Sequence, residues 1–223
     1  GLTRWPERRA DVGVFGRPAV CLPSLATLRL ADANGDWTTL SGVKSVVWVI
    51  GTQEGGGFVL AGAPGTFSFH RGSAPGDWPV GSFADRPILS SVYAGGDIAS
   101  TAKCTWRLNG EVIDPTVTGF RAAWEILSMN LRSDDGNVPD IGGFAADARA
   151  FQEWEQANRA GRQRLCEVIF YDRVLTTEEV AANEAYLNAK WGVLPTRTAV
   201  QNGLGVILAG GALDCAGTDQ YVD

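Results

Sequence analysis

The stretch EVIFYDRVLTTEEV, residues 167–180, changes its periodicity half-way along. Val168 to Tyr171 form a continuous apolar run of β-favouring residues, and this run predicts a buried strand over 165–172. Thr176 and Glu179 then show the S/T-x-x-E spacing of a capping box, in which each side chain accepts a backbone amide of the helix start. A buried strand therefore leads almost directly into a capped helix.

The predicted helix covers residues 177–190. Val180, Leu187 and Trp191 recur at helical spacing and mark one apolar face of it. Gly192 supplies a left-handed cap at the C-terminus, and a proline shortly afterwards prevents the helix from continuing. This helix closes the core region of the chain.

Upstream of this stretch, short β-like segments are separated by glycine and proline. The clearest segment is CTWRLNGEVID, residues 104–114, in which apolar and polar residues alternate on both sides of Asn109-Gly110. Asn and Gly both tolerate positive φ, so they predict the two-residue type I′ turn of a hairpin. Further strands are predicted at 25–30, 43–50, 58–62, 66–72, 88–95 and 122–131.

Two segments break the β pattern. Residues 1–24 contain three prolines and no sustained period, which predicts an irregular N-terminal arm. Residues 144–164 are rich in Ala, Gln, Glu and Arg, which predicts an inserted helix that ends at Gly161. The sequence starts at Gly1 without an initiator Met, which fits either a processed N-terminus or a piece of a longer chain.

Composition limits the classes of function. The 223 residues are 45% hydrophobic and include 28 Gly, which is typical of a globular, turn-rich protein. The formal charge is −6 and the basic residues are scattered, which argues against a nucleic-acid partner. No apolar run reaches the roughly 18 residues that a membrane-spanning helix needs, so no membrane insertion is expected.

The four cysteines, Cys21, Cys104, Cys166 and Cys215, form no CxxC pair, which argues against a zinc site. In a secreted protein they would allow two disulfides with about three alternative pairings. Cys104 and Cys166 lie in predicted strands, where a reduced cysteine packs as a small hydrophobic residue. The sequence favours reduced thiols over disulfides.

The segment 167–192 resembles the closing signature of the concanavalin A-like, laminin G-like jelly-roll domains of bacterial and phage proteins. Members of this lectin-like family commonly end with a strand, a Tyr-Asp-Arg-x-Leu turn, an acidic helix start, then Tyr-Leu and Lys-Trp-Gly. The matching residues here are Glu167, Tyr171, Asp172, Arg173, Leu175, Glu179, Tyr186, Leu187, Lys190, Trp191 and Gly192. The LNGE hairpin, Ile141-Gly142-Gly143 and the SVVWVI strand extend the resemblance over 45–192.

The resemblance implies an all-β, concanavalin A-like jelly-roll sandwich of two antiparallel sheets, with one inserted helix and one C-terminal flanking helix. The implied organisation is an irregular arm at 1–24, a lectin-like jelly-roll domain at 25–194 and a C-terminal tail at 195–223. Structural roles are implied for the signature residues: Asp172 and Arg173 would staple the turn, and Trp191 would cover an apolar surface.

The tail ends in ALDCAGTDQYVD, residues 212–223, which resembles the opening strand of the same family. Three interpretations stay open. The segment begins a second lectin-like unit, completes the sandwich of its own chain, or completes the sandwich of a neighbour. Exchange with a neighbour would make it an assembly device, because an extended segment can add to an open sheet edge.

The sequence predicts no catalytic residues. Glycan hydrolases need two carboxylates across the cleft, which jelly-roll relatives carry on alternate residues of one strand. Glu153 and Glu155 come closest, but they lie in the predicted inserted helix, where residues two apart diverge. His70 is the only histidine, and no Gly-x-Ser-x-Gly elbow accompanies it, so His70 is interpreted as a surface residue at a strand end.

Two acidic loops are candidate cation sites. Asp32, Asn34 and Asp36 alternate in the way that oxygen ligands of calcium do, although the Gly spacing is not that of an EF-hand. The alternative is a polar turn in which the side chains cap their own backbone, and the sequence favours this alternative. A second acidic loop contains Asp134, Asp135, Asn137 and Asp140.

Trp37, Trp78 and Trp106 lie near loops or hairpins, and exposed rings there would stack on the C–H face of a sugar. Together these features predict a non-catalytic structural or adhesion protein of a virion or extracellular surface, such as a phage capsid decoration or tail component. Its partners would be copies of itself or other virion or surface subunits, with host glycan as a further ligand. The alternative is a secreted bacterial carbohydrate-binding module, and a glycan hydrolase is a remote third.

Overall fold

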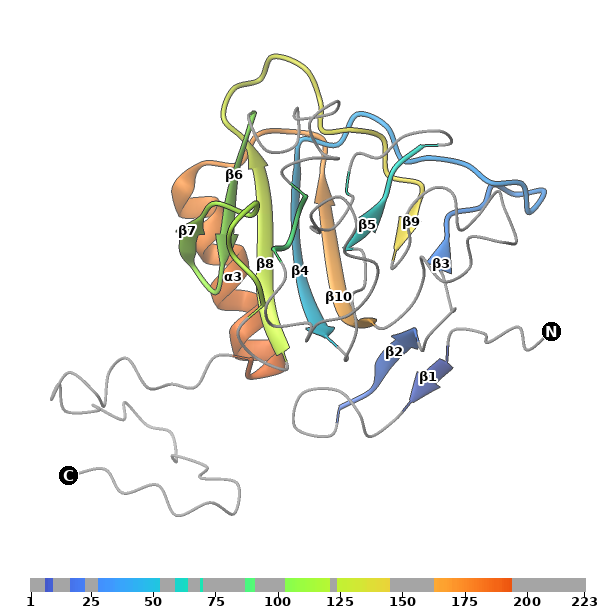
Figure 1. The fold of residues 1–223 in the computed structure, drawn as a ribbon, viewed down its shortest axis with the longest axis horizontal. Helices are drawn as coiled ribbons and strands as arrows, with labels where there is room; N and C mark the ends of the chain where they lie inside the picture. The colour runs from blue at the N-terminus through green and yellow to red at the C-terminus, as the bar shows by residue number, and fades with distance from the viewer. Residues whose placement is uncertain are drawn as a thin grey trace, which may run out of the picture. The chain divides into compact units, whose positions relative to one another are not determined.

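A computed structural model describes residues 7–9, 17–22, 28–52, 59–63, 69, 87–90, 103–120, 124–144 and 163–193. Over these residues the chain is mostly β, with two antiparallel sheets and one helix, which is consistent with an all-β sandwich (Figure 1). The sequence correctly predicted this fold class, two sheets and a flanking helix.

The larger sheet has seven strands in the order β1 (Glu7–Arg9), β2 (Ala19–Leu22), β10 (Gln163–Tyr171), β4 (Ser45–Thr52), β8 (Trp124–Leu131), β6 (Cys104–Leu108) and β7 (Glu111–Ile113). The smaller sheet has the order β3 (Leu28–Arg29), β9 (Gly143–Phe144) and β5 (Leu60–Ala61). Helix α3 (Thr177–Trp191) follows β10 after a short turn.

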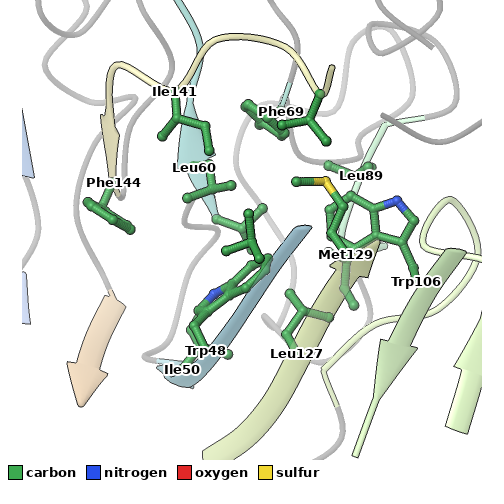
Figure 2. Close-up of a cluster of buried hydrophobic side chains, with 14 of the residues drawn as sticks. Trp48, Ile50, Leu60, Phe69, Leu89, Trp106, Leu127, Met129, Ile141 and Phe144 are labelled. Carbon is green, nitrogen blue, oxygen red and sulfur yellow. The ribbon is translucent and has the colours of Figure 1, made fainter. Parts of the chain in front are cut away.

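The hydrophobic core lies between the two sheets (Figure 2). Strand β4 contributes Trp48 and Ile50, and the smaller sheet contributes Leu60 and Phe144. Trp48 packs edge-on against Trp106, with ring centroids 6.4 Å apart. Alternate residues of a strand point to one face, so this core uses every second residue of the central strands.

The opposite face of the larger sheet is also apolar, and α3 packs against it at β4 and β8. Val47, Val49 and Ile126 are at most 1% exposed on this outer face. The helix buries Val180 and Leu187 there. Burial on both faces explains why SVVWVI is a continuous apolar run rather than an alternating one.

The clearest local predictions are confirmed. Asn109 (φ 54°) and Gly110 (φ 84°) form the two-residue turn between β6 and β7. Helix α3 extends one residue beyond the predicted end and stops at Gly192, whose φ of 65° is the left-handed cap conformation.

The prediction of an irregular arm over 1–24 is wrong for β1 and β2. These strands pair with each other, and β2 pairs with Gln163–Leu165 of β10. Pro18 precedes β2 and does not interrupt it, so the backbone amides of β2 can pair with both neighbouring strands. The larger sheet therefore includes β1 and β2, which precede residue 25, the predicted start of the domain.

Two further segments are only partly described. Phe144 belongs to β9, and the rest of the predicted inserted helix lies outside the described residues. Of the predicted strand 88–95, the structure describes 88–90, which follow an isolated bridge between Pro87 and Gly119. The predicted strand 66–72 is described only at Phe69, and the tail 195–223 is not described.

Gly142, directly before β9, lies in close contact with β5 and with the indole of Trp37. Its amide donates to Ala61 O at 2.8 Å, and its carbonyl accepts Trp37 Nε1 at 3.0 Å. A Cβ at this position would lie 2.5 Å from Gly62 O and 2.9 Å from Trp37 Nε1. A backbone oxygen at that distance cannot move without displacing β5.

We expect Gly142→Ala to lower the free energy of unfolding by about 1–3 kcal/mol, as overpacking usually does. Urea unfolding monitored by tryptophan fluorescence measures the change. Gly136→Ala shows for comparison the cost of backbone strain without a clash, because Gly136 has φ 93° and nothing lies within 4 Å of the added methyl group, whereas Gly142 has no left-handed φ. An unchanged midpoint for Gly142→Ala would contradict the close approach of these strands.

Candidate functional site

The turn between β10 and α3, residues 172–176, is held by a polar junction with the larger sheet. Ser45 of β4 and Asn130 of β8 are cross-strand partners on the outer face. The Ser45 hydroxyl contacts Asn130 Oδ1 and lies 2.9 Å from Arg173 O. The Leu175 amide donates to Asn130 Oδ1 at 3.0 Å, and Asn130 Nδ2 donates to Leu175 O at 2.9 Å. The turn is thereby fixed to the two central strands.

The helix start beyond this junction is doubly capped. The Glu179 amide donates to the Thr176 hydroxyl at 3.2 Å, and the Thr176 amide donates to Glu179 Oε2 at 2.9 Å. Arg173 forms an ion pair with the same carboxylate at 2.7 Å. The Arg173 hydrogen bond, with the Thr176 amide, lowers the pKa of Glu179 to about 2. Asp172 is exposed, and its carboxylate makes no ion pair with the described residues.

The other end of α3 is tied to β10 through Glu167. Its carboxylate accepts Trp191 Nε1 at 2.7 Å and the Tyr186 hydroxyl at 3.1 Å, and it pairs with Lys190 at 2.8 Å. Burial alone would raise the pKa of Glu167, but the hydrogen bonds from Lys190, Trp191 and Tyr186 outweigh it and lower the pKa. Trp191, which is half-buried, thus anchors the end of the helix to β10 through its hydrogen bond to Glu167.

The structure separates the three tryptophans predicted to contact glycan. Trp106 is 1% exposed, so its prediction as an exposed ring is wrong. Trp106 lies on the same inner face of β6 as Cys104 and Leu108, and it packs in the core. Trp37 is half-buried, and its indole N–H is hydrogen-bonded to Gly142. Trp78 lies outside the described residues.

The predicted calcium trio forms a self-capped turn. Asp32 Oδ1 accepts the amides of Asn34 at 2.8 Å and Asp36 at 3.0 Å. Gly35 adopts φ 86° and donates to Asp32 O. The described part of the chain contains no group of three His, Cys, Asp or Glu side chains arranged to hold a metal ion. In the second acidic loop, Asp134 pairs with Lys44.

The cysteines that the structure describes, Cys21, Cys104 and Cys166, carry thiols rather than disulfides. Burial raises the pKa of Cys104 to about 12, against the smaller opposing effects of Arg132 and Lys103. A thiol with this pKa is a poor nucleophile at neutral pH. Outside the described residues lie Cys215, His70, Glu153 and Glu155. Among the described residues, no helix is long and apolar enough to span a membrane.

A buried carboxyl group on α3 was not predicted from the sequence. Glu184 is 7% exposed and accepts a 2.8 Å hydrogen bond from Ser128 of β8. Burial is the main effect on its pKa and raises it, while Ser128 and Arg107 oppose the shift. The spacing in the sequence indicates this burial, because Glu184 lies four residues after Val180 and three before Leu187, on the apolar face of the helix.

A second feature missed from the sequence is a row across the outer face of the larger sheet. Arg164, Gly51 and Trp124 are cross-strand neighbours on β10, β4 and β8. The Arg164 guanidinium lies 5.2 Å from the Trp124 ring centroid. A Cβ on Gly51 would lie 2.7 Å from the Trp124 ring. The glycine lets the indole lie across β4, and the cation packs on it.

No family model, curated protein or solved structure matches the chain in comparisons with known proteins.

We expect Asn130→Ala to destabilise the protein by about 1–3 kcal/mol, because it removes the side-chain partner of the Leu175 carbonyl and leaves the Leu175 amide only its longer hydrogen bond to the Ser45 hydroxyl, at 3.3 Å. Chemical unfolding measures the loss. Asn137→Ala is the matched control, since Asn137 is exposed. Equal stability of the two variants would show that the polar junction does not hold the turn.

The turn interpretation of Asp32 makes a separate prediction. Asp32→Ala should lower stability by about 0.5–1.5 kcal/mol, whereas Asp32→Asn should retain much of it, because an amide oxygen can accept the same backbone hydrogen bonds. Thermal unfolding with and without a chelator provides the measurement. A chelator-dependent melting temperature that Asp32→Asn abolishes would instead assign a calcium site.

Proposed function

We propose that this chain is a non-catalytic structural or adhesion protein of a virion or extracellular surface, with a lectin-like, concanavalin A-like jelly-roll topology. The closing signature and the antiparallel order of β2, β10, β4 and β8 support the jelly-roll assignment. The polar groups of that signature hold helix and sheet together, which is a scaffold role. Its partners are copies of itself or neighbouring virion or surface subunits.

The observation that carries the assembly proposal is the sheet edge at β7, on which no strand of the described residues pairs. This strand is the last in the order of the larger sheet, and Val112 is 59% exposed on it. In a two-residue hairpin Leu108 and Glu111 form the hydrogen-bonded pair next to the turn, so the backbone groups of Val112 point away from β6. Val117, just beyond the strand, is 75% exposed.

A strand with an exposed apolar residue and outward backbone groups is a surface to which another strand adds. Natural sheets usually protect such an edge with charge. β7 carries the exposed Glu111 next to the turn, but its central residue is a valine. The alternative of a carbohydrate-binding module receives less support, because Trp106 is buried and the Trp37 indole is already hydrogen-bonded. A glycan hydrolase remains the remote alternative.

Light scattering over a range of protein concentrations tests whether the protein self-associates through the β7 edge. We expect the full chain to self-associate and Val112→Lys to reduce the mass toward that of a monomer, because a central lysine blocks edge pairing. Leu40→Lys is the control, since Leu40 is also exposed (37%) but lies outside β7. A monomeric full chain at every concentration would contradict self-assembly.

The terminal segment 212–223 provides a second test of assembly. If this segment adds to a neighbour, a chain shortened by these residues should lose oligomers while keeping the melting temperature of the full chain. An unchanged mass by light scattering would count against that role. A lower melting temperature without a change of mass would favour completion within one chain.

A further inference from the structure

Glu184 interrupts the apolar surface by which α3 packs on the larger sheet. Its neighbours on the same helical face, Val180 and Leu187, are 2% and 0% exposed. An ionisable side chain at such a position loses most of its hydration when the helix docks. The protonation state of Glu184 therefore affects how firmly the helix is held.

The groups around the Glu184 carboxyl compensate little of this loss. Ser128 of β8, itself 1% exposed, donates the hydrogen bond to Oε1. On the same face, β4 presents Val47, the cross-strand partner of Ser128. In the hairpin, a Cβ on Gly110 would lie 3.6 Å from Oε2. The sheet thus offers one hydroxyl and otherwise little polar contact.

Arg107 of β6 is the charged group that acts on Glu184 from the described part of the sheet. It is the other cross-strand partner of Ser128. Its guanidinium donates to Gly110 O at 3.3 Å, and no Arg107–Glu184 ion pair within 4.0 Å occurs in the described structure. The positive charge opposes the effect of burial without cancelling it.

We propose that Glu184 is a pH-sensitive latch, which holds α3 on the larger sheet more firmly in mild acid than at neutral pH. The neutral carboxylic acid fits the apolar surface between helix and sheet, whereas the carboxylate is poorly solvated there. Loosening of the helix at neutral pH would uncover Val47, Val49 and Ile126 on the outer face. The proposal does not depend on the assembly role proposed above.

The sign of the pH effect follows from linkage. Because burial raises the pKa of Glu184 above its ordinary value of 4.5, the folded protein binds this proton more tightly than the unfolded chain. The contribution of Glu184 to stability is complete below pH 4.5 and is lost as the pH rises through the raised pKa of the folded protein. Glu167 and Glu179 have lowered pKa values, so their contributions are lost as pH falls below 4.5. These three groups together therefore contribute most to stability in mild acid.

Thermal unfolding of the full chain between pH 4 and pH 8 tests the latch. We expect Glu184→Gln to raise the melting temperature at pH 7 by about 2–4 °C, the shift that a change near 1 kcal/mol produces in a protein of this size. The difference from the parent should vanish toward pH 4, where the parent is protonated. A melting temperature of Glu184→Gln at pH 7 that equals or falls below that of the parent would overturn the proposal.

Glu178→Gln is the matched control on the same helix. Glu178 is exposed, and hydrogen bonds from its own amide and from Thr176 lower its pKa, so its removal should not stabilise the protein at pH 7. NMR titration of the Glu184 carboxyl carbon in the unmodified chain gives an independent readout. Titration at or below pH 4.5 would overturn the latch even if the variant failed to fold.

Discussion

The burial of β4 and β8 on both faces is the constraint on which the structure depends. One face of these strands packs in the core between the sheets, and the other packs beneath α3. Neither face can be covered by strand pairing alone, so the sandwich needs the helix as well as the second sheet. The short turn from β10 to α3 makes this covering intramolecular, and it places the helix over β4, which pairs with β10, and over β8, the next strand in the sheet.

The polar groups of the junction explain why the turn has a specific sequence. Ser45 and Asn130 lie at the end of the outer face, where the helix has not yet begun, and they bind the backbone of Arg173 and Leu175. Arg173 then pairs with Glu179, the residue that also caps the helix. These contacts explain in structural terms why the turn has this sequence.

Local signals in the sequence were sufficient for the hairpin and for the helix with its caps, because Asn109-Gly110, Thr176 and Gly192 each act within a few residues. Distant partners decide the rest. Strands β1 and β2 are stabilised by pairing at the edge of β10, which no short stretch of sequence encodes. Trp106 looked exposed because it lies beside a turn, but the register of β6 against β8 places it in the core. The sequence around Asp32 favours a turn over a calcium site, and the backbone hydrogen bonds to its carboxylate show that turn.

Amide hydrogen exchange of the native chain tests the central claim most directly. If β4 and β8 are covered on both faces, their hydrogen-bonded amides should exchange only through global unfolding, with protection matching the free energy of unfolding. The edge strands β1 and β7 should exchange through much smaller openings. Exchange of β4 amides as fast as those of β7 would contradict a sheet enclosed between core and helix.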